Sequence, residues 1–271
     1  MSSANEGPAA PQPPASPATP SNAASRSPGR TLGSIWAWTS VLLVIFFGFW
    51  VQLVLFVVSR PFDPLRKVPG RFFRLMAVFC TKLNPFWQFR YLGHPKKPDG
   101  KLVFVSNHAS NADVFLISAL PWEMKWLGKA SLFRQPIFGW CMSLAGDIPV
   151  ERGDKQAAAS ALRKCAEWVR QGMPVMIFPE GTRSLDGVML PFKDGAFRLA
   201  IDTGARIVPL GVAGTREALP KRSWRFGPGR GRVVMGEPIE AAGRDLKELK
   251  AEVRAAVEVL AARAVAASKE A

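Results

Sequence analysis

An uncharged, apolar segment near the N-terminus most constrains what this chain can fold into. No charged residue occurs between Thr31 and Ser59, and residues 35–58 are almost continuously apolar. A helix over residues 35–58 would be about 36 Å long, enough to cross a bilayer core with some tilt. Three of its residues are aromatic side chains of the kind that sits near membrane interfaces: Trp36, Trp38 and Trp50. The segment predicts a membrane anchor, with a buried core helix as the alternative.

The flanks of this segment differ from those of a cleaved signal peptide, which has a shorter apolar region and a small-residue cleavage site. Residues 1–30 contain seven prolines and no large apolar side chain beyond Met1. They cannot bury enough surface to offset the entropy of ordering, so a disordered tail is expected. Basic residues lie mainly after the segment, which predicts that the following domain faces the cytoplasm from the cell (inner) membrane. A half-immersed hairpin with the tail on the same side is the alternative.

Residues 71–92 are predicted to form a second helix. Bulky apolar residues recur there at helical spacing, with basic residues elsewhere around the helix, and Pro85 is expected to end or kink it. A helix in the headgroup layer and an ordinary packed helix fit the pattern equally. The predicted organisation is therefore a tail (residues 1–30), a membrane anchor with an interfacial helix (residues 31–92) and one domain with a C-terminal helix (residues 93–271).

The remaining chain alternates short apolar runs with helical patterns. Strands are expected at residues 101–106, 174–178, 206–212 and 232–235. Helices are expected at residues 113–120, capped by Ser110 or Asn111, at residues 155–171, and, as a solvent-exposed helix, at residues 245–268. This alternation predicts an α/β fold with a mixed, largely parallel sheet flanked by helices. Ligand sites in such folds lie at the carboxyl ends of the strands.

The formal net charge of +15 favours a polyanionic partner, namely nucleic acid, acidic lipid headgroups or phosphorylated substrates. No nucleic-acid-binding motif occurs in the chain. The three cysteines form no C-x-x-C pair, which predicts reduced, unreactive thiols in a domain that faces the cytosol.

The motif NHASNAD, at residues 107–113, contains one of only two histidines. His108 and Asp113 can meet only if the chain turns between them, and a strand followed by a helix supplies that turn. A neutral imidazole can deprotonate an alcohol while the carboxylate fixes its tautomer, and backbone amides near the helix start can stabilise an oxyanion. The alternative is a capping aspartate beside a structural histidine.

A second motif, FPEGTRS at residues 178–184, directly follows a predicted strand. Gly181 permits a sharp turn or close ligand approach, Thr182 offers a hydroxyl, and Arg183 offers a planar fork for a phosphate. Glu180 can orient Arg183 or accept from a hydroxyl. The alternative is a tight turn with a solvated Glu–Arg pair. Lys129 and Arg152 are further candidates for phosphate contact, although each alone is typical of a surface charge.

Together these segments resemble the glycerolipid acyltransferase family, specifically bacterial 1-acyl-sn-glycerol-3-phosphate acyltransferases. The resemblance covers roughly residues 60–238 and rests on four blocks in order: NHASNAD; GKASLF with the later PIFGW and IPVERGD; FPEGTRS; and IVPLGVAG. Two departures are Ala112, where the family often has a bulky residue, and Glu151, where many members have Asp.

The resemblance implies that His108 is the general base and Asp113 the residue that orients it. It implies that the acceptor's phosphate is bound by a matching set of residues: Lys129, Arg152, Glu180, Gly181, Thr182 and Arg183. The implied reaction moves an acyl group from acyl-CoA or acyl-carrier protein to lysophosphatidic acid, giving phosphatidic acid, with no metal or cofactor. The alternatives are another lysophospholipid or lyso-aminolipid as acceptor, and a non-catalytic basic protein that binds the membrane surface.

Overall fold

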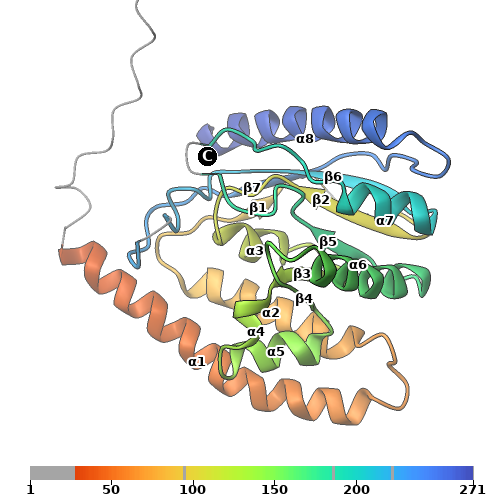
Figure 1. The fold of residues 1–271 in the computed structure, drawn as a ribbon. Coiled ribbons are helices and arrows are strands. Elements are labelled where there is room, and N and C mark those ends of the chain that lie inside the picture. Colours follow the sequence, from red (N-terminus) through yellow and green to blue (C-terminus); the bar gives the residue numbers. More distant parts are fainter. Residues whose placement is uncertain (1–27, 94–95, 185–186, 221–222, 271) are drawn as a thin grey trace, which may run out of the picture.

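The computed structural model describes residues 28–93, 96–184, 187–220 and 223–270 and is built around one seven-stranded sheet (Figure 1). Its spatial order is β1-β7-β6-β2-β5-β3-β4, and all neighbours are parallel except β6 and β7. The strands are β1 (Arg90–Tyr91), β2 (Leu102–Ser106), β3 (Lys125–Lys129), β4 (Ile148–Val150), β5 (Val175–Ile177), β6 (Arg206–Ala213) and β7 (Arg232–Met235). The predicted mixed, largely parallel sheet is confirmed.

Helices flank this sheet on both faces. They are α1 (Pro28–Ser59), α2 (Lys67–Leu83), α3 (Ala112–Ile117), α4 (Ala130–Phe133), α5 (Phe138–Ala145), α6 (Lys155–Arg170), α7 (Gly195–Thr203) and α8 (Leu246–Lys269). Strand β2 shows how the two faces arise, because its successive side chains alternate between two cores. Val103 and Val105 pack with α6, α7 and α8, whereas Leu102 and Phe104 pack with α3. Every residue of β2 is buried, as expected of a central parallel strand.

The C-terminal helix differs from its prediction as a solvent-exposed helix. One stripe of α8 is buried against β6 and β7, and its members recur every three to four residues: Leu249, Val253, Val257, Leu260 and Ala264. Gly211 of β6 permits this packing, because a Cβ atom there would lie 2.2 Å from the backbone N of Ala261. The prediction from the sequence missed this apolar stripe because charged residues are abundant on the outer face of the helix.

Helix α1 confirms the predicted apolar helix, and it is the one described helix long and apolar enough to cross a membrane. Its buried residues are small or polar: Ser34, Ala37, Ser40, Gln52 and Ser59. Many of its large apolar side chains point outward, and Leu32, Phe47 and Val54 are more than half exposed, whereas Val44, Ile45 and Phe49 are partly buried against α2 and α5. The most deeply buried residues of the helix are therefore small or polar, and its most exposed residues are apolar, which is the reverse of a core helix. The predicted tail lies outside the described residues except for residues 28–30, which begin α1.

Helix α2 begins earlier and ends earlier than the predicted helix over residues 71–92. It ends at Leu83, before Pro85, as the proline predicted. Residues 90–91 instead form β1, which pairs with β7 of the sheet. Helix α2 lies beside α1 below the sheet and also packs against α3 and α5 (Figure 1). Leu75 and Phe79 remain exposed, so the helix is packed on one side and apolar on another.

The three cysteines are free and buried. Burial raises the pKa of Cys80 to about 11 and the pKa values of Cys141 and Cys165 to about 12. Thiolates are therefore scarce at neutral pH, which agrees with the predicted unreactive thiols.

Candidate active site

The structure brings His108 and Asp113 together at the carboxyl end of β2. The chain turns after Ser106, and α3 begins at Ala112, so Asp113 lies in the first turn of the helix. His108 Nδ1 lies 2.9 Å from Asp113 Oδ2. Ser110 Oγ accepts from the Ala112 N–H at 3.2 Å, whereas the side chain of Asn111 makes no capping bond. The predicted turn that brings His108 and Asp113 together is thus confirmed, whereas the catalytic role of these two residues stays a prediction.

The carboxylate of Asp113 is completely buried and held by several donors. Its Oδ2 accepts from the backbone N–H groups of Ala109, at 2.8 Å, and Ser110, at 2.9 Å. Its Oδ1 accepts from the hydroxyl of Thr215. An ionised carboxylate can only accept, so the Nδ1–H of His108 donates to it. The lone pair on Nε2 is then available to act as a base.

These contacts contradict the expectation that backbone amides near the start of α3 can stabilise an oxyanion. The backbone N–H groups of residues 109, 110, 112 and 113 all donate to groups inside the turn. They hold the aspartate and begin the helix, so they are not open to a developing oxyanion.

The second motif lies directly against the first. The ring of Phe178 stacks on the imidazole of His108, with centroids 4.0 Å apart and planes 18° apart. The carboxylate of Glu180 accepts from the His108 N–H at 2.6 Å, and the Ser184 N–H donates to the His108 carbonyl at 3.0 Å. This proximity follows from the sheet, because β2 and β5 are parallel neighbours.

Glu180 accepts hydrogen bonds from backbone N–H groups rather than orienting Arg183. One carboxylate oxygen accepts from His108 as described, and the other accepts from the Leu190 N–H at 2.8 Å. Burial raises the pKa of this carboxyl, and the two backbone hydrogen bonds oppose that rise. Glu180 therefore joins the two motifs, which sequence reasoning did not foresee.

Gly181 has a φ of +70°, and a Cβ atom there would lie 2.8 Å from Lys193 Nζ. This turn therefore requires glycine for its backbone conformation, and a larger residue there would also displace the ammonium group of Lys193. Lys193 is exposed, lies fifteen residues beyond Phe178 and was missed from the sequence. Its backbone N–H donates to the Pro179 carbonyl at 2.9 Å, which ties it to the motif.

Positive charge gathers at the same edge of the sheet. Lys129 ends β3 and is exposed, and Arg152 follows β4 by two residues. The pKa of Arg152 is lowered by partial burial and by the positive charge of Arg183. Two guanidinium groups that repel one another in this way favour a bound dianion such as a phosphate. Thr182, which precedes Arg183 in the sequence, is exposed.

Two further residues of the first motif hold the turn in place through tertiary hydrogen bonds that the sequence interpretation did not predict. The amide side chain of Asn107 exchanges two hydrogen bonds of 2.8 Å with the backbone of Val212 in β6. The hydroxyl of Ser110 donates to the Leu219 carbonyl at 3.1 Å. With Thr215, they connect the His–Asp turn to the segment after β6.

Comparisons with known proteins agree with this fold. An acyltransferase family model matches residues 88–213, which include both motifs. The 1-acyl-sn-glycerol-3-phosphate acyltransferase alpha of Ovis aries is 34% identical over 203 residues, which cover 73% of this chain and 70% of that protein. The chloroplastic relative LPAT1 of Arabidopsis thaliana is 34% identical over 203 residues, 72% of this chain.

The crystal structure of the 1-acyl-sn-glycerophosphate (LPA) acyltransferase PlsC from Thermotoga maritima superposes with a TM-score of 0.75 at 25% identity, covering 87% of this chain and 95% of that one. The chain belongs to the 1-acyl-sn-glycerol-3-phosphate acyltransferase family. It spans 56% of the length of the Arabidopsis relative.

Proposed function

We propose that this protein transfers a fatty acyl group from acyl-CoA or acyl-carrier protein to the free hydroxyl of 1-acyl-sn-glycerol-3-phosphate. The product would be phosphatidic acid, an intermediate of phospholipid biosynthesis. The contact between His108 Nδ1 and Asp113 Oδ2 carries the proposal, because it leaves Nε2 free to take a proton. The names of the relatives support the same reaction.

In the proposed mechanism, Nε2 of His108 removes the proton of the acceptor hydroxyl as its oxygen attacks the thioester carbonyl. Asp113 stabilises the imidazolium that forms. The tetrahedral intermediate then collapses, the carbon–sulfur bond breaks, and the leaving thiolate takes the proton from Nε2. The acyl group passes directly to the acceptor, so no covalent enzyme intermediate or cofactor is needed.

The basic edge of the sheet supports a phosphorylated acceptor. In this proposal Arg152 and Arg183 bind the phosphate, and Lys129, Lys193 and Thr182 surround it. Gly181 permits the close approach, and Glu180 holds the loop against His108. A lyso-aminolipid without a phosphate would leave the two guanidinium groups unpaired, which favours the phosphorylated acceptor over it.

The acceptor would reach the site from a cytoplasmic face of the cell (inner) membrane. Helix α1 is bonded to the rest of the protein near both ends: Arg30 donates to the Phe226 carbonyl at 2.8 Å, and Gln52 donates to the Cys141 carbonyl at 3.0 Å. A helix held along the protein in this way fits the half-immersed hairpin better than a free membrane-spanning helix. Its outward apolar side would then contact lipid.

Purified protein, a labelled thioester and a panel of lysolipids test the proposal. We expect phosphatidic acid from lysophosphatidic acid, with either acyl-CoA or acyl-carrier protein as donor, and loss of this activity in His108→Ala. Folding and membrane association of the variant should be unchanged. Near-normal turnover by His108→Ala would refute the mechanism, and binding to liposomes without thioester consumption would favour a non-catalytic membrane protein.

A further inference from the structure

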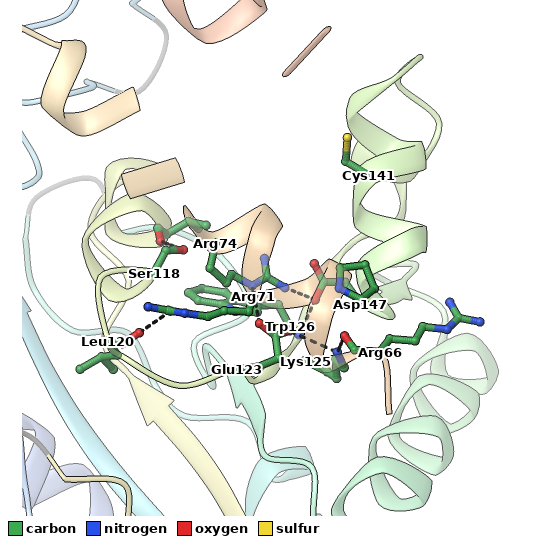
Figure 2. Close-up of polar contacts among 12 residues, drawn as sticks. Arg66, Arg71, Arg74, Ser118, Leu120, Glu123, Lys125, Trp126, Cys141 and Asp147 are labelled. Atoms are coloured by element: carbon green, nitrogen blue, oxygen red, sulfur yellow. Dashed lines mark hydrogen bonds and ion pairs between the residues drawn. The ribbon is translucent and has the colours of Figure 1, made fainter. Parts of the chain in front are cut away.

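Four charged side chains are buried between α2 and the sheet, away from the candidate active site. They are Arg74 of α2, Glu123, Lys125 at the start of β3, and Asp147 immediately before β4, and each is at most 8% exposed. We call them the buried charge cluster. Figure 2 shows their side chains directed toward one another.

The cluster contains two positive and two negative groups. Arg74 Nη2 forms an ion pair with Asp147 Oδ1, and Lys125 Nζ lies 3.2 Å from Glu123 Oε1. Arg74 Nε lies 3.9 Å from Glu123 Oε2, which links the two pairs. Burial raises the pKa of Glu123 and lowers the pKa of Lys125, and the neighbouring opposite charges oppose both shifts. The cluster is therefore neutral as a whole, and the loss of one member would leave an uncompensated buried charge.

Helix α2 lies in close contact with the cluster at Gly70. A Cβ atom on Gly70 would lie 2.3 Å from Glu123 Oε1, so a larger residue there would displace the carboxylate of Glu123. Arg71 donates to the Leu120 carbonyl at 2.7 Å, and Lys125 donates to the Arg66 carbonyl at 2.8 Å (Figure 2). The cluster thus joins the α1–α2 hairpin to the strands.

Asp147 also sets the position of β4 relative to β3. Its Oδ1 accepts from the Trp126 N–H at 2.9 Å, one residue before the pairing of Leu127 with Ile148 begins. The same carboxylate oxygen is the one that Arg74 contacts. A single ion pair therefore fixes the beginning of this strand pair against α2.

The other end of this short strand pair bears two proposed phosphate ligands. The pairing ends with Lys129 beside Val150, and Arg152 follows two residues later. A displacement of the strands at the cluster would reach both cations, because only three residue pairs make up this strand pair.

We propose that Arg74 and Asp147 are positioning residues, which hold β3 and β4 so that Lys129 and Arg152 meet the acceptor's phosphate. The inference rests on the proposed function. It assigns to α2 a part in acceptor recognition, although α2 supplies no group to the site itself.

The double variant Arg74→Met with Asp147→Asn tests this role. It removes one charge of each sign, so the remaining cluster stays neutral, and the asparagine oxygen can still accept from Trp126. The measurements are kcat, the KM for lysophosphatidic acid, and the inhibition constant of glycerol 3-phosphate, which carries the same phosphate. We expect KM and the inhibition constant to rise about tenfold, because small misplacements of a binding group are costly. We expect kcat to change less than twofold.

Arg163→Met is the matched control, because Arg163 is an exposed arginine of α6, and it should leave all three values unchanged. Unchanged KM and inhibition constants in the double variant, or a fall in kcat alone, would overturn the proposal, since lost folded protein lowers only kcat. If the double variant does not fold, Arg74→Lys decides, because a shorter side chain with one point charge should raise KM while kcat holds.

His108→Ala, measured in parallel, separates the two proposals. Its continued activity would count against the proposed function. Its inactivity, together with an unchanged KM in the double variant, would count against the positioning role alone.

Discussion

The imidazole of His108 lies flat against the ring of Phe178, with ring centroids 4.0 Å apart. The two residues follow neighbouring parallel strands, so this contact joins the ends of β2 and β5. The phenylalanine covers one face of the imidazole, while Asp113 holds its Nδ1 edge. The orientation of the proposed base thus depends on an apolar neighbour as well as on a carboxylate.

Phe178→Leu should lower kcat by about fivefold, because a stacked aromatic contact contributes about 1 kcal/mol and the leucine holds the imidazole less firmly. The KM for the acceptor should change little, because Phe178 offers no group to a phosphate. Steady-state kinetics with lysophosphatidic acid measure both values. A rise in KM with normal kcat would show that the stacking does not orient the base.

Thr215→Val should destabilise the protein by about 1–3 kcal/mol, because it removes a hydrogen bond to a buried carboxylate without changing the side-chain volume. The value of kcat should fall as well, since Asp113 is then less firmly held. Denaturant unfolding and kinetics check the two effects. Thr215→Ser is the matched control, and it should retain most of the stability and most of the kcat of the wild type. Equal losses of stability and kcat in Thr215→Ser and Thr215→Val would contradict a role for the hydroxyl.

Arg152→Ala and Arg183→Ala should each raise the acceptor KM by roughly tenfold to a hundredfold, since a charge-assisted hydrogen bond contributes about 1.5–3 kcal/mol. Added salt should raise the wild-type KM, because it screens the attraction of a phosphate to these cations. KM measured over a range of salt concentrations tests this. Arg170→Ala, on the exposed side of α6, serves as the control, and normal affinity in both active-site variants would remove the pair from the phosphate site.

Glu180 should make stability fall as the pH rises. Burial raises its pKa in the folded state, so the folded protein holds this proton at pH values where the unfolded chain has lost it. The free energy of unfolding therefore decreases between the ordinary glutamate pKa and the raised one. Denaturant unfolding of wild type and Glu180→Gln at several pH values isolates this contribution. The wild type should lose stability relative to the variant across that interval, and a constant difference would disprove the assignment.

The elements with strong local patterns were predictable from the sequence. The apolar strands β2, β5 and β6 follow from their continuous apolar runs, and α6 follows from its periodicity, with Asp154 capping its first turn. The turn between His108 and Asp113 was predictable because a strand ends and a helix begins within a few residues.

The elements between residues 123 and 150 were not predictable in the same way. Strand β3 begins with Lys125, which is fully buried although it is charged. It pairs with the nearby Glu123 and donates to the carbonyl of Arg66, which is distant in the sequence. Helices α4 and α5 are short and lack a clear periodicity. Local sequence patterns also do not reveal Thr215 and Lys193 as site residues, because each reaches the site only through tertiary contacts.

The inverted surface of α1 has a consequence for shortened forms of this protein. Gln52 donates to the carbonyls of Pro69 and Cys141 from the buried side of that helix. Cutting the chain after residue 59 would leave both acceptors without their donor and would bare the side of α2 that α1 now covers. Removal of α1 would therefore replace one exposed apolar surface with another. A soluble form would come more readily from polar substitutions at outward positions of α1 such as Phe47 and Val54.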